Sequence, residues 1–94
     1  MPPKHEKLFD KAKNRTQAGW KTHELESLYE GYGFQIRGGK ESHRNVSHPD
    51  YPDNLNLRGT FTAHPKEIDP VYVKSAIGLI EELMRLKGEI TDDN

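Results

Sequence analysis

The chain has 94 residues, of which 32% are hydrophobic and 31% charged, so it has the size of one small domain with a thin core. Its 14 Lys and Arg residues nearly balance 15 Asp and Glu residues, for a net charge of −1, which leaves room for a local basic patch but not for a broadly basic surface. The absence of cysteine excludes a disulfide scaffold, a thiolate nucleophile and a cysteine-ligated zinc site.

The first predicted element is a short amphipathic helix over residues 4–15, where Leu8 and Ala12 lie four positions apart among charged neighbours. This N-terminal segment has no hydrophobic signal-peptide core. No apolar run in the chain approaches the ~20 residues that span a bilayer. We therefore expect a soluble, cytoplasmic protein.

A second helix is predicted to start at Thr22, with the threonine as its N-cap, and to end at Gly31 and Gly33. Glu24 falls in the first turn, where the helix dipole favours an acid. Three apolar positions share one face of this helix: Leu25, Leu28 and Tyr29. Tyr29, Tyr32 and Trp20 are expected at the margin of the core rather than as platforms on which bases stack.

Three strands are predicted next, over FQIR (34–37), SHRNVSH (42–48) and LNLRGTFTA (55–63), the last having the clearest alternation. If Val46 in the second strand points toward the core, the alternation of side chains places His43 on the outer face. The Gly38-Gly39 pair between the first two strands is expected to supply a hairpin turn with positive φ. PDYPDN must turn, because prolines do not sit in a central strand.

The last predicted element is the strongest, a helix with Asp69 as N-cap, Pro70 as its first residue and Gly88 as its stop. The order of elements predicts an α+β fold with two layers, a three-stranded antiparallel meander packed against helices. We divide the chain into an N-terminal helical extension (1–19), an α-β-β-β-α domain (20–88) and a disordered acidic tail (89–94).

Of the five histidines, His43 is the main candidate for chemistry, although a surface histidine at the start of a strand is also common. Cleavage of RNA through the 2′-hydroxyl needs a base and an acid, and histidine serves in both roles because its ordinary pKa lies near neutrality. His48 is interpreted as structural, and His5 and His23 as solvated. No metal site is expected, because the histidines lack ligand spacing.

Basic residues lie near His43 in the predicted sheet: Arg37, Lys40, Arg44 and Arg58. We place Arg37 and Arg58 in neighbouring strands and Lys40 in the loop. Together they can hold phosphates through charge-assisted hydrogen bonds. The alternative is ordinary solvated charge, or pairing with Glu41 and Asp50.

The stretch YGFQIRGGKESHRNVSHPDYP, set in the order α-β-β-β-α, resembles the HicA family of bacterial toxins. In that family a helix ending in Gly-Phe leads to a strand, a Gly-Ser-His loop and a second strand. Gly33-Phe34 and Ser42-His43 match these motifs, and YVKSAIGLIEEL is similar to the family's closing helix. The resemblance covers roughly residues 20–87. One departure is Glu41, which stands where the family has the glycine before Ser-His.

The resemblance implies a double-stranded-RNA-binding-like fold, cleavage of mRNA as an endoribonuclease, and a HicB-like antitoxin partner that covers the active site. It places the catalytic histidine at His43, and no metal or cofactor is expected. We assign RNA binding to nearby residues: Arg37, Lys40, Ser42, Arg44 and Arg58. Because Glu41 would repel a phosphate, the alternative is a catalytically inactive HicA-like module that binds RNA or a protein.

Overall fold

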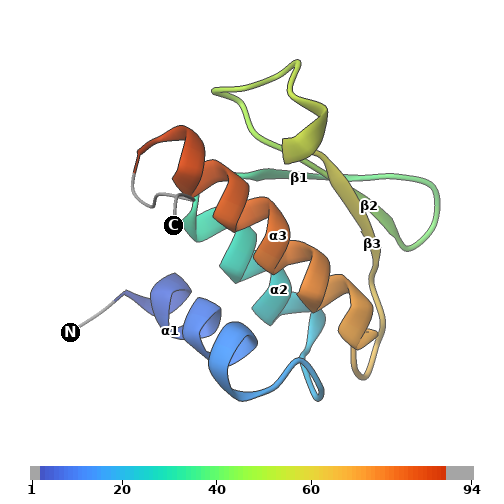
Figure 1. Cartoon of the computed structure of the whole chain (residues 1–94). Coiled ribbons are helices and arrows are strands. Elements are labelled where there is room, and N and C mark those ends of the chain that lie inside the picture. Colours follow the sequence, from blue (N-terminus) through green and yellow to red (C-terminus); the bar gives the residue numbers. More distant parts are fainter. Residues whose placement is uncertain (1–2, 89–94) are drawn as a thin grey trace.

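A three-stranded antiparallel sheet and three α-helices make up residues 3–88, the part of the chain that the computed structural model describes (Figure 1). This confirms the predicted α+β class. The elements follow in the order α1 (Lys4–Asp10), η1 (Lys11–Arg15, a π-helical turn), α2 (Thr22–Gly31), β1 (Gln35–Gly38), β2 (His43–Ser47), η2 (Leu55–Leu57, a 3₁₀ turn), β3 (Gly59–Thr62) and α3 (Pro70–Leu86).

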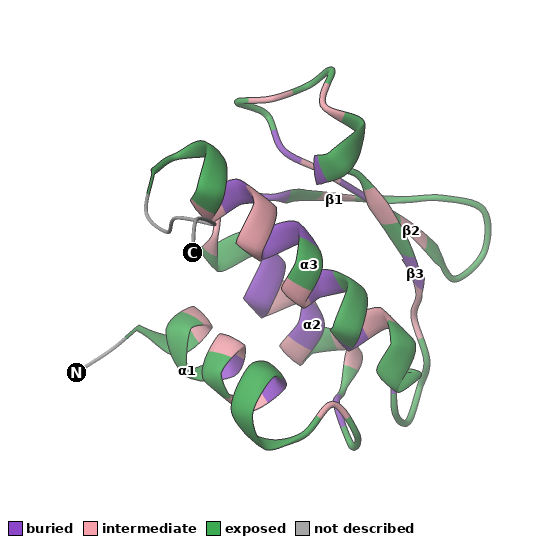
Figure 2. Cartoon of the chain, in the orientation of Figure 1, coloured by how far each residue is buried: buried purple, intermediate pink, exposed green. Residues whose placement is uncertain are grey.

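The helices lie on one side of the sheet, which leaves its other face open (Figure 1). α2 packs against β1, and α3 packs against β3 and η2. α1 packs against α2, and η1 against α3, so the N-terminal helix adds to the helical layer. Buried stretches run along α2 and α3, whereas α1 is mostly exposed (Figure 2). Any ligand of the sheet must therefore approach its open face or its loops.

β2 is the central strand and pairs antiparallel with both β1 and β3. Asn45 lies opposite Arg37 on one side and opposite Thr60 on the other, so these three residues form a row across the sheet. Successive side chains along a strand point to opposite faces. Since Val46 is buried, its neighbour Asn45 and the rest of that row face outward, as predicted.

The core contains aromatic rings from both layers, in one cluster that also includes Leu8 and Ala12. The Tyr29 ring stacks on Phe61 at 6.2 Å between centroids and meets Phe34 edge-on at 5.5 Å. Burial raises the pKa of the Tyr29 phenol well above its usual value.

Trp20 is fully buried, and its Nε1 donates to the carbonyl of Thr16 at 2.9 Å. We expected Trp20 and Tyr29 at the margin of the core, but both lie inside it. Neither ring is therefore accessible for stacking on a base.

The start of α2 differs from the prediction, because Thr22 is not its N-cap. The cap position is Lys21, whose backbone N–H donates to Glu24 Oε1 at 2.8 Å. The Thr22 hydroxyl instead donates to the carbonyl of His64 at 3.0 Å and accepts from the His64 N–H at 3.1 Å. Thr22 thus ties α2 to the segment that follows β3, a contact between residues 42 positions apart.

We predict that Glu24→Gln lowers the free energy of unfolding by about 0.5–1 kcal/mol at pH 7, since it keeps an acceptor for the Lys21 N–H but removes the negative charge at the start of α2 and the ion pair with Lys11. Burial opposes ionisation of Glu24, but the Lys21 N–H and the Lys11 ammonium, 3.3 Å away, outweigh it and lower the pKa of the carboxyl. A lowered folded-state pKa gives stability that is present above the unfolded pKa, about 4.3, and is lost as the pH falls through the folded pKa. Urea unfolding at pH 7 and pH 3 measures this, with the exposed Glu30→Gln as control; a difference from wild type that is equal at both pH values contradicts it.

The last helix forms as predicted. Asp69 Oδ1 accepts a hydrogen bond from the Val71 N–H at 3.0 Å, Pro70 is the first helical residue, and Gly88 follows the helix with φ of +75°. The buried face of α3 carries five apolar residues, which are Val73, Ala76, Leu79, Ile80 and Leu83. The predicted acidic tail (89–94) lies outside the described residues.

The strand predicted over residues 55–63 is wrong in its first half. Only Gly59–Thr62 is a strand, and Leu55–Leu57 forms a 3₁₀ turn that leaves Leu55 74% exposed. The Asn54 side chain accepts a hydrogen bond from the Asn56 N–H at 2.9 Å, and the Asn54 carbonyl accepts from the Leu57 N–H at 3.1 Å. These local bonds draw the backbone away from extended geometry.

Candidate functional site on the open face of the sheet

The open face of the sheet carries polar and basic side chains. By alternation from the buried Val46 and Phe61, the outward positions of the strands carry no carboxylate. These positions are Gln35 and Arg37 on β1, His43, Asn45 and Ser47 on β2, and Thr60 and Thr62 on β3. Arg37 is the one formally charged residue among these positions, so the strands present a positive charge and no negative charge on this face.

His43 is the first residue of β2 and is exposed on this face. Its cross-strand neighbours are small: Thr62 on β3, and Gly39, whose N–H donates to the His43 carbonyl at 2.7 Å. A Cβ at Gly39 would lie 3.3 Å from the Cβ of His43, so the glycine leaves this flank of the side chain uncovered. Among the described residues, no hydrogen bond or ion pair holds the imidazole of His43. Its two nitrogens are therefore free to bind a ligand or exchange a proton.

His48 shows the opposite arrangement, since it is 2% exposed and held on both ring nitrogens. Nδ1 accepts from the Asp50 N–H at 3.2 Å, so Nε2 carries the proton and donates to the carbonyl of Tyr32, also at 3.2 Å. The ring meets Phe34 edge-on at 5.0 Å. His48 is therefore a structural residue that joins the end of β2 to the end of α2.

The remaining histidines also differ from one another. His5 is not simply solvated as predicted, because its ring packs edge-on against Tyr32 at 4.7 Å and its Cβ lies over Gly31, where a Cβ would be only 2.1 Å away. His64 is exposed and accepts from the Lys66 N–H through Nδ1 at 3.0 Å. His23 is exposed on α2.

The turn beside His43 is formed by residues 40–43, with the His43 N–H donating to the Lys40 carbonyl at 3.1 Å. Within this turn Glu41 has a φ of +58°. Positive φ was predicted for Gly38 and Gly39, but neither residue has it. Gly38 instead continues β1, opposite Arg44, so the turn lies at residues 40–43 and not at Gly38-Gly39. Glu41 is thus a non-glycine residue in the conformation that most favours glycine.

The predicted phosphate-binding residues separate into two groups. Lys40 and Ser42 lie in the turn next to His43, and Arg44 bends back to donate to the carbonyls of His43 at 3.1 Å and Glu41 at 3.4 Å. Arg37 and Arg58 lie further along the sheet. They are not in neighbouring strands as predicted, because β2 runs between β1 and the residue that precedes β3.

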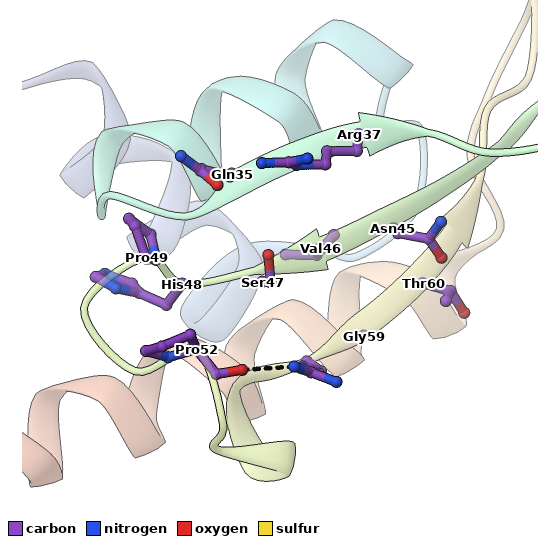
Figure 3. Close-up of a pocket in the computed structure, with 11 residues that line it drawn as sticks. Gln35, Arg37, Asn45, Val46, Ser47, His48, Pro49, Pro52, Gly59 and Thr60 are labelled. Atoms are coloured by element: carbon purple, nitrogen blue, oxygen red, sulfur yellow. Dashed lines mark hydrogen bonds between the residues drawn. The ribbon is translucent and has the colours of Figure 1, made fainter.

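A hollow of about 640 Å³ lies on the open face (Figure 3), starting at the row of Arg37, Asn45 and Thr60, two residues along β2 from His43, and continuing past Ser47. The 49–58 segment bounds it through Pro49 and Pro52, and Arg58 donates to the Pro52 carbonyl. Side chains from all three strands line it, including Gln35, Arg37, Asn45, Ser47 and Thr60. The two arginines were predicted as binding residues, but the neutral polar residues were not, although the period-two alternation of the strands carried the signal.

Within residues 3–88, no three His, Asp or Glu residues lie close enough to hold a metal ion. No helix in the same range is long and apolar enough to cross a membrane. Comparisons with protein-family models, with curated proteins and with solved structures give no match to this chain.

Proposed function

We propose that this protein is a HicA-like toxin, an endoribonuclease that cleaves mRNA with His43 as its catalytic residue. The observation that carries the proposal is the position of His43, which is exposed, has no side-chain partner within residues 3–88, and lies on a sheet face whose outward strand positions carry Arg37 and no carboxylate. The arrangement of a sheet covered on one face by helices agrees with the fold that the resemblance implies. Ser42 and Lys40 beside His43 support it as the residues next to the reacting phosphate.

The proposed chemistry is intramolecular attack by a ribose 2′-oxygen on the adjacent phosphorus. Neutral His43 accepts the proton of the 2′-hydroxyl as the P–O2′ bond forms and the P–O5′ bond breaks. The imidazolium then returns the proton to the departing 5′-oxygen. The products are a 2′,3′-cyclic phosphate and a 5′-hydroxyl. A positioned group of this kind contributes roughly 10²–10⁴-fold to the rate.

An antitoxin of the HicB type is the proposed protein partner, and the cytoplasm the proposed compartment. The open sheet face is the surface that such a partner must cover to block His43. We expect expression of the chain without antitoxin to arrest the growth of a bacterial host, and the His43→Ala variant not to. Equal growth with both proteins, or equal arrest by both, would contradict the proposal.

An inactive module that binds RNA or a protein is the second candidate, and Glu41 favours it. This carboxylate stands in the turn that carries Lys40 and Ser42, where it repels a phosphate approaching His43. Such a module causes no growth arrest and cleaves no RNA, even at high concentration, so the expression experiment also separates the two candidates.

We predict that Glu41→Gly stabilises the protein by about 0.5–1 kcal/mol and strengthens its binding to RNA. A left-handed conformation costs a residue with a side chain about 1–2 kcal/mol, part of which is offset by the greater unfolded-state entropy of glycine. Glu41→Gln is the matched control, since it removes the charge and keeps the backbone strain. Urea unfolding together with RNA titration separates the two effects; a less stable Glu41→Gly variant contradicts the prediction.

A further inference from the structure

The hollow on the open face has a composition suited to an anion. Two arginines line it from opposite sides of β2, Arg37 on β1 and Arg58 next to β3, and none of its lining residues is acidic. Among the described residues, nothing pairs with the Arg37 guanidinium. Arg58 donates to the Pro52 carbonyl, which holds the guanidinium at the rim and leaves further N–H donors available.

The neutral lining of the hollow adds hydrogen-bonding groups but no stacking surface. Two amides and two hydroxyls face it, on Gln35, Asn45, Ser47 and Thr60. The one aromatic ring in its lining belongs to His48, which is buried and bonded on both nitrogens. Recognition of a base by stacking is therefore disfavoured, and contacts to phosphate and ribose hydroxyls are favoured.

We propose that the hollow is a subsite for a backbone phosphate of single-stranded RNA, upstream or downstream of the phosphate that reacts at His43. Arg37 and Arg58 hold the phosphate, and the amides and hydroxyls contact ribose 2′-hydroxyls. The link to cleavage rests on the proposed function, whereas the binding of RNA in the hollow does not.

The dimensions of the sheet favour one strand of RNA over a duplex. Strands lie about 4.8 Å apart, so β1 and β3 are separated by roughly 10 Å, the width over which two arginines reach a single backbone between them. Arg37 pairs with Asn45, which is two residues or roughly 7 Å from His43 along β2, and Arg58 precedes Gly59, whose partner Val46 is roughly 10 Å from His43. Because the hollow holds a phosphate other than the reacting one, the substrate must extend beyond the two nucleotides that flank the cleaved bond, and dinucleotides should be poor substrates.

The test uses the His43→Ala variant of the full chain, so that RNA stays intact, with a single-stranded RNA hexanucleotide as the probe. We expect the NMR amide signals of Asn45, Ser47 and Thr60 to shift. We expect Arg37→Gln/Arg58→Gln to weaken binding roughly tenfold and to lower the salt dependence by about 0.7 in log Kd per log salt, the value for one phosphate on a single strand. Arg37→Gln alone, which breaks no hydrogen bond or ion pair within residues 3–88, should give part of the loss, and the exposed Arg15→Gln none.

Three results would overturn the inference: unchanged affinity in the double arginine variant, tighter binding of a duplex than of the single strand, or binding of a Glu-rich peptide in the hollow in preference to RNA. Cleavage assays distinguish this failure from that of the proposed function. If the wild type cuts RNA and the double variant cuts it equally well, the proposed subsite is contradicted and the proposed nuclease function is not. If RNA binds in the hollow but is never cut, the subsite is supported and the nuclease function is contradicted.

Discussion

Replacing His43 with alanine is expected to lower the single-turnover rate of RNA cleavage by roughly 10²–10⁴-fold, the contribution of a positioned general acid–base group. The side chain is exposed and makes no hydrogen bond to the described residues, so its removal leaves the fold intact. The free energy of unfolding should therefore stay within about 0.5 kcal/mol of wild type.

The matched control for this variant is His23→Ala, which removes another exposed histidine, on α2 and away from the open face. We expect wild-type cleavage from it. A rate that falls equally in both variants, or in neither, would remove His43 from the mechanism.

The His48→Ala variant is expected to lose stability instead, by about 2–4 kcal/mol. The ring is buried against Phe34 and Tyr51, and its loss leaves the Asp50 N–H and the Tyr32 carbonyl without their partner. The cleavage rate per folded molecule should not change, because His48 does not reach the position of the reacting phosphate near His43.

Urea unfolding followed by fluorescence measures this loss, since the chain has one tryptophan and Trp20 is fully buried. His43→Ala serves as the second histidine variant in the same experiment. A His48→Ala protein as stable as His43→Ala would contradict the structural role of His48.

The elements that could be predicted from sequence are those whose signals are local and mutually consistent. Asp69 and Pro70 mark the start of α3, and the apolar spacing that follows marks its buried face. Val46 alone was enough to orient β2, because alternation then places His43 outward. These signals depend on neighbours within a few residues.

The errors arise where two local solutions compete or where the answer depends on pairing between strands. Leu55 and Leu57 alternate as in a strand, but the side chain of Asn54 stabilises a 3₁₀ turn there. Positive φ was expected at Gly38 and Gly39, yet the register that pairs Gly38 with Arg44 moves the turn to Glu41.

The hollow could not be predicted for the same reason. Its walls combine side chains from three strands with the 49–58 segment, so it exists only once the register is set. Thr22 is a similar case, because its partner His64 is 42 residues away. Sequence reasoning identified the residue types for a site but not which of them meet.

The ends of the RNA fragments produced by the purified protein give the most direct test of a nuclease that acts through His43. Mass spectrometry of a defined single-stranded RNA after incubation should find 5′-hydroxyl ends and 2′,3′-cyclic phosphates, and a substrate with 2′-deoxyribose at the cleaved position should resist. Intact RNA, or fragments with 5′-phosphate ends, would contradict it.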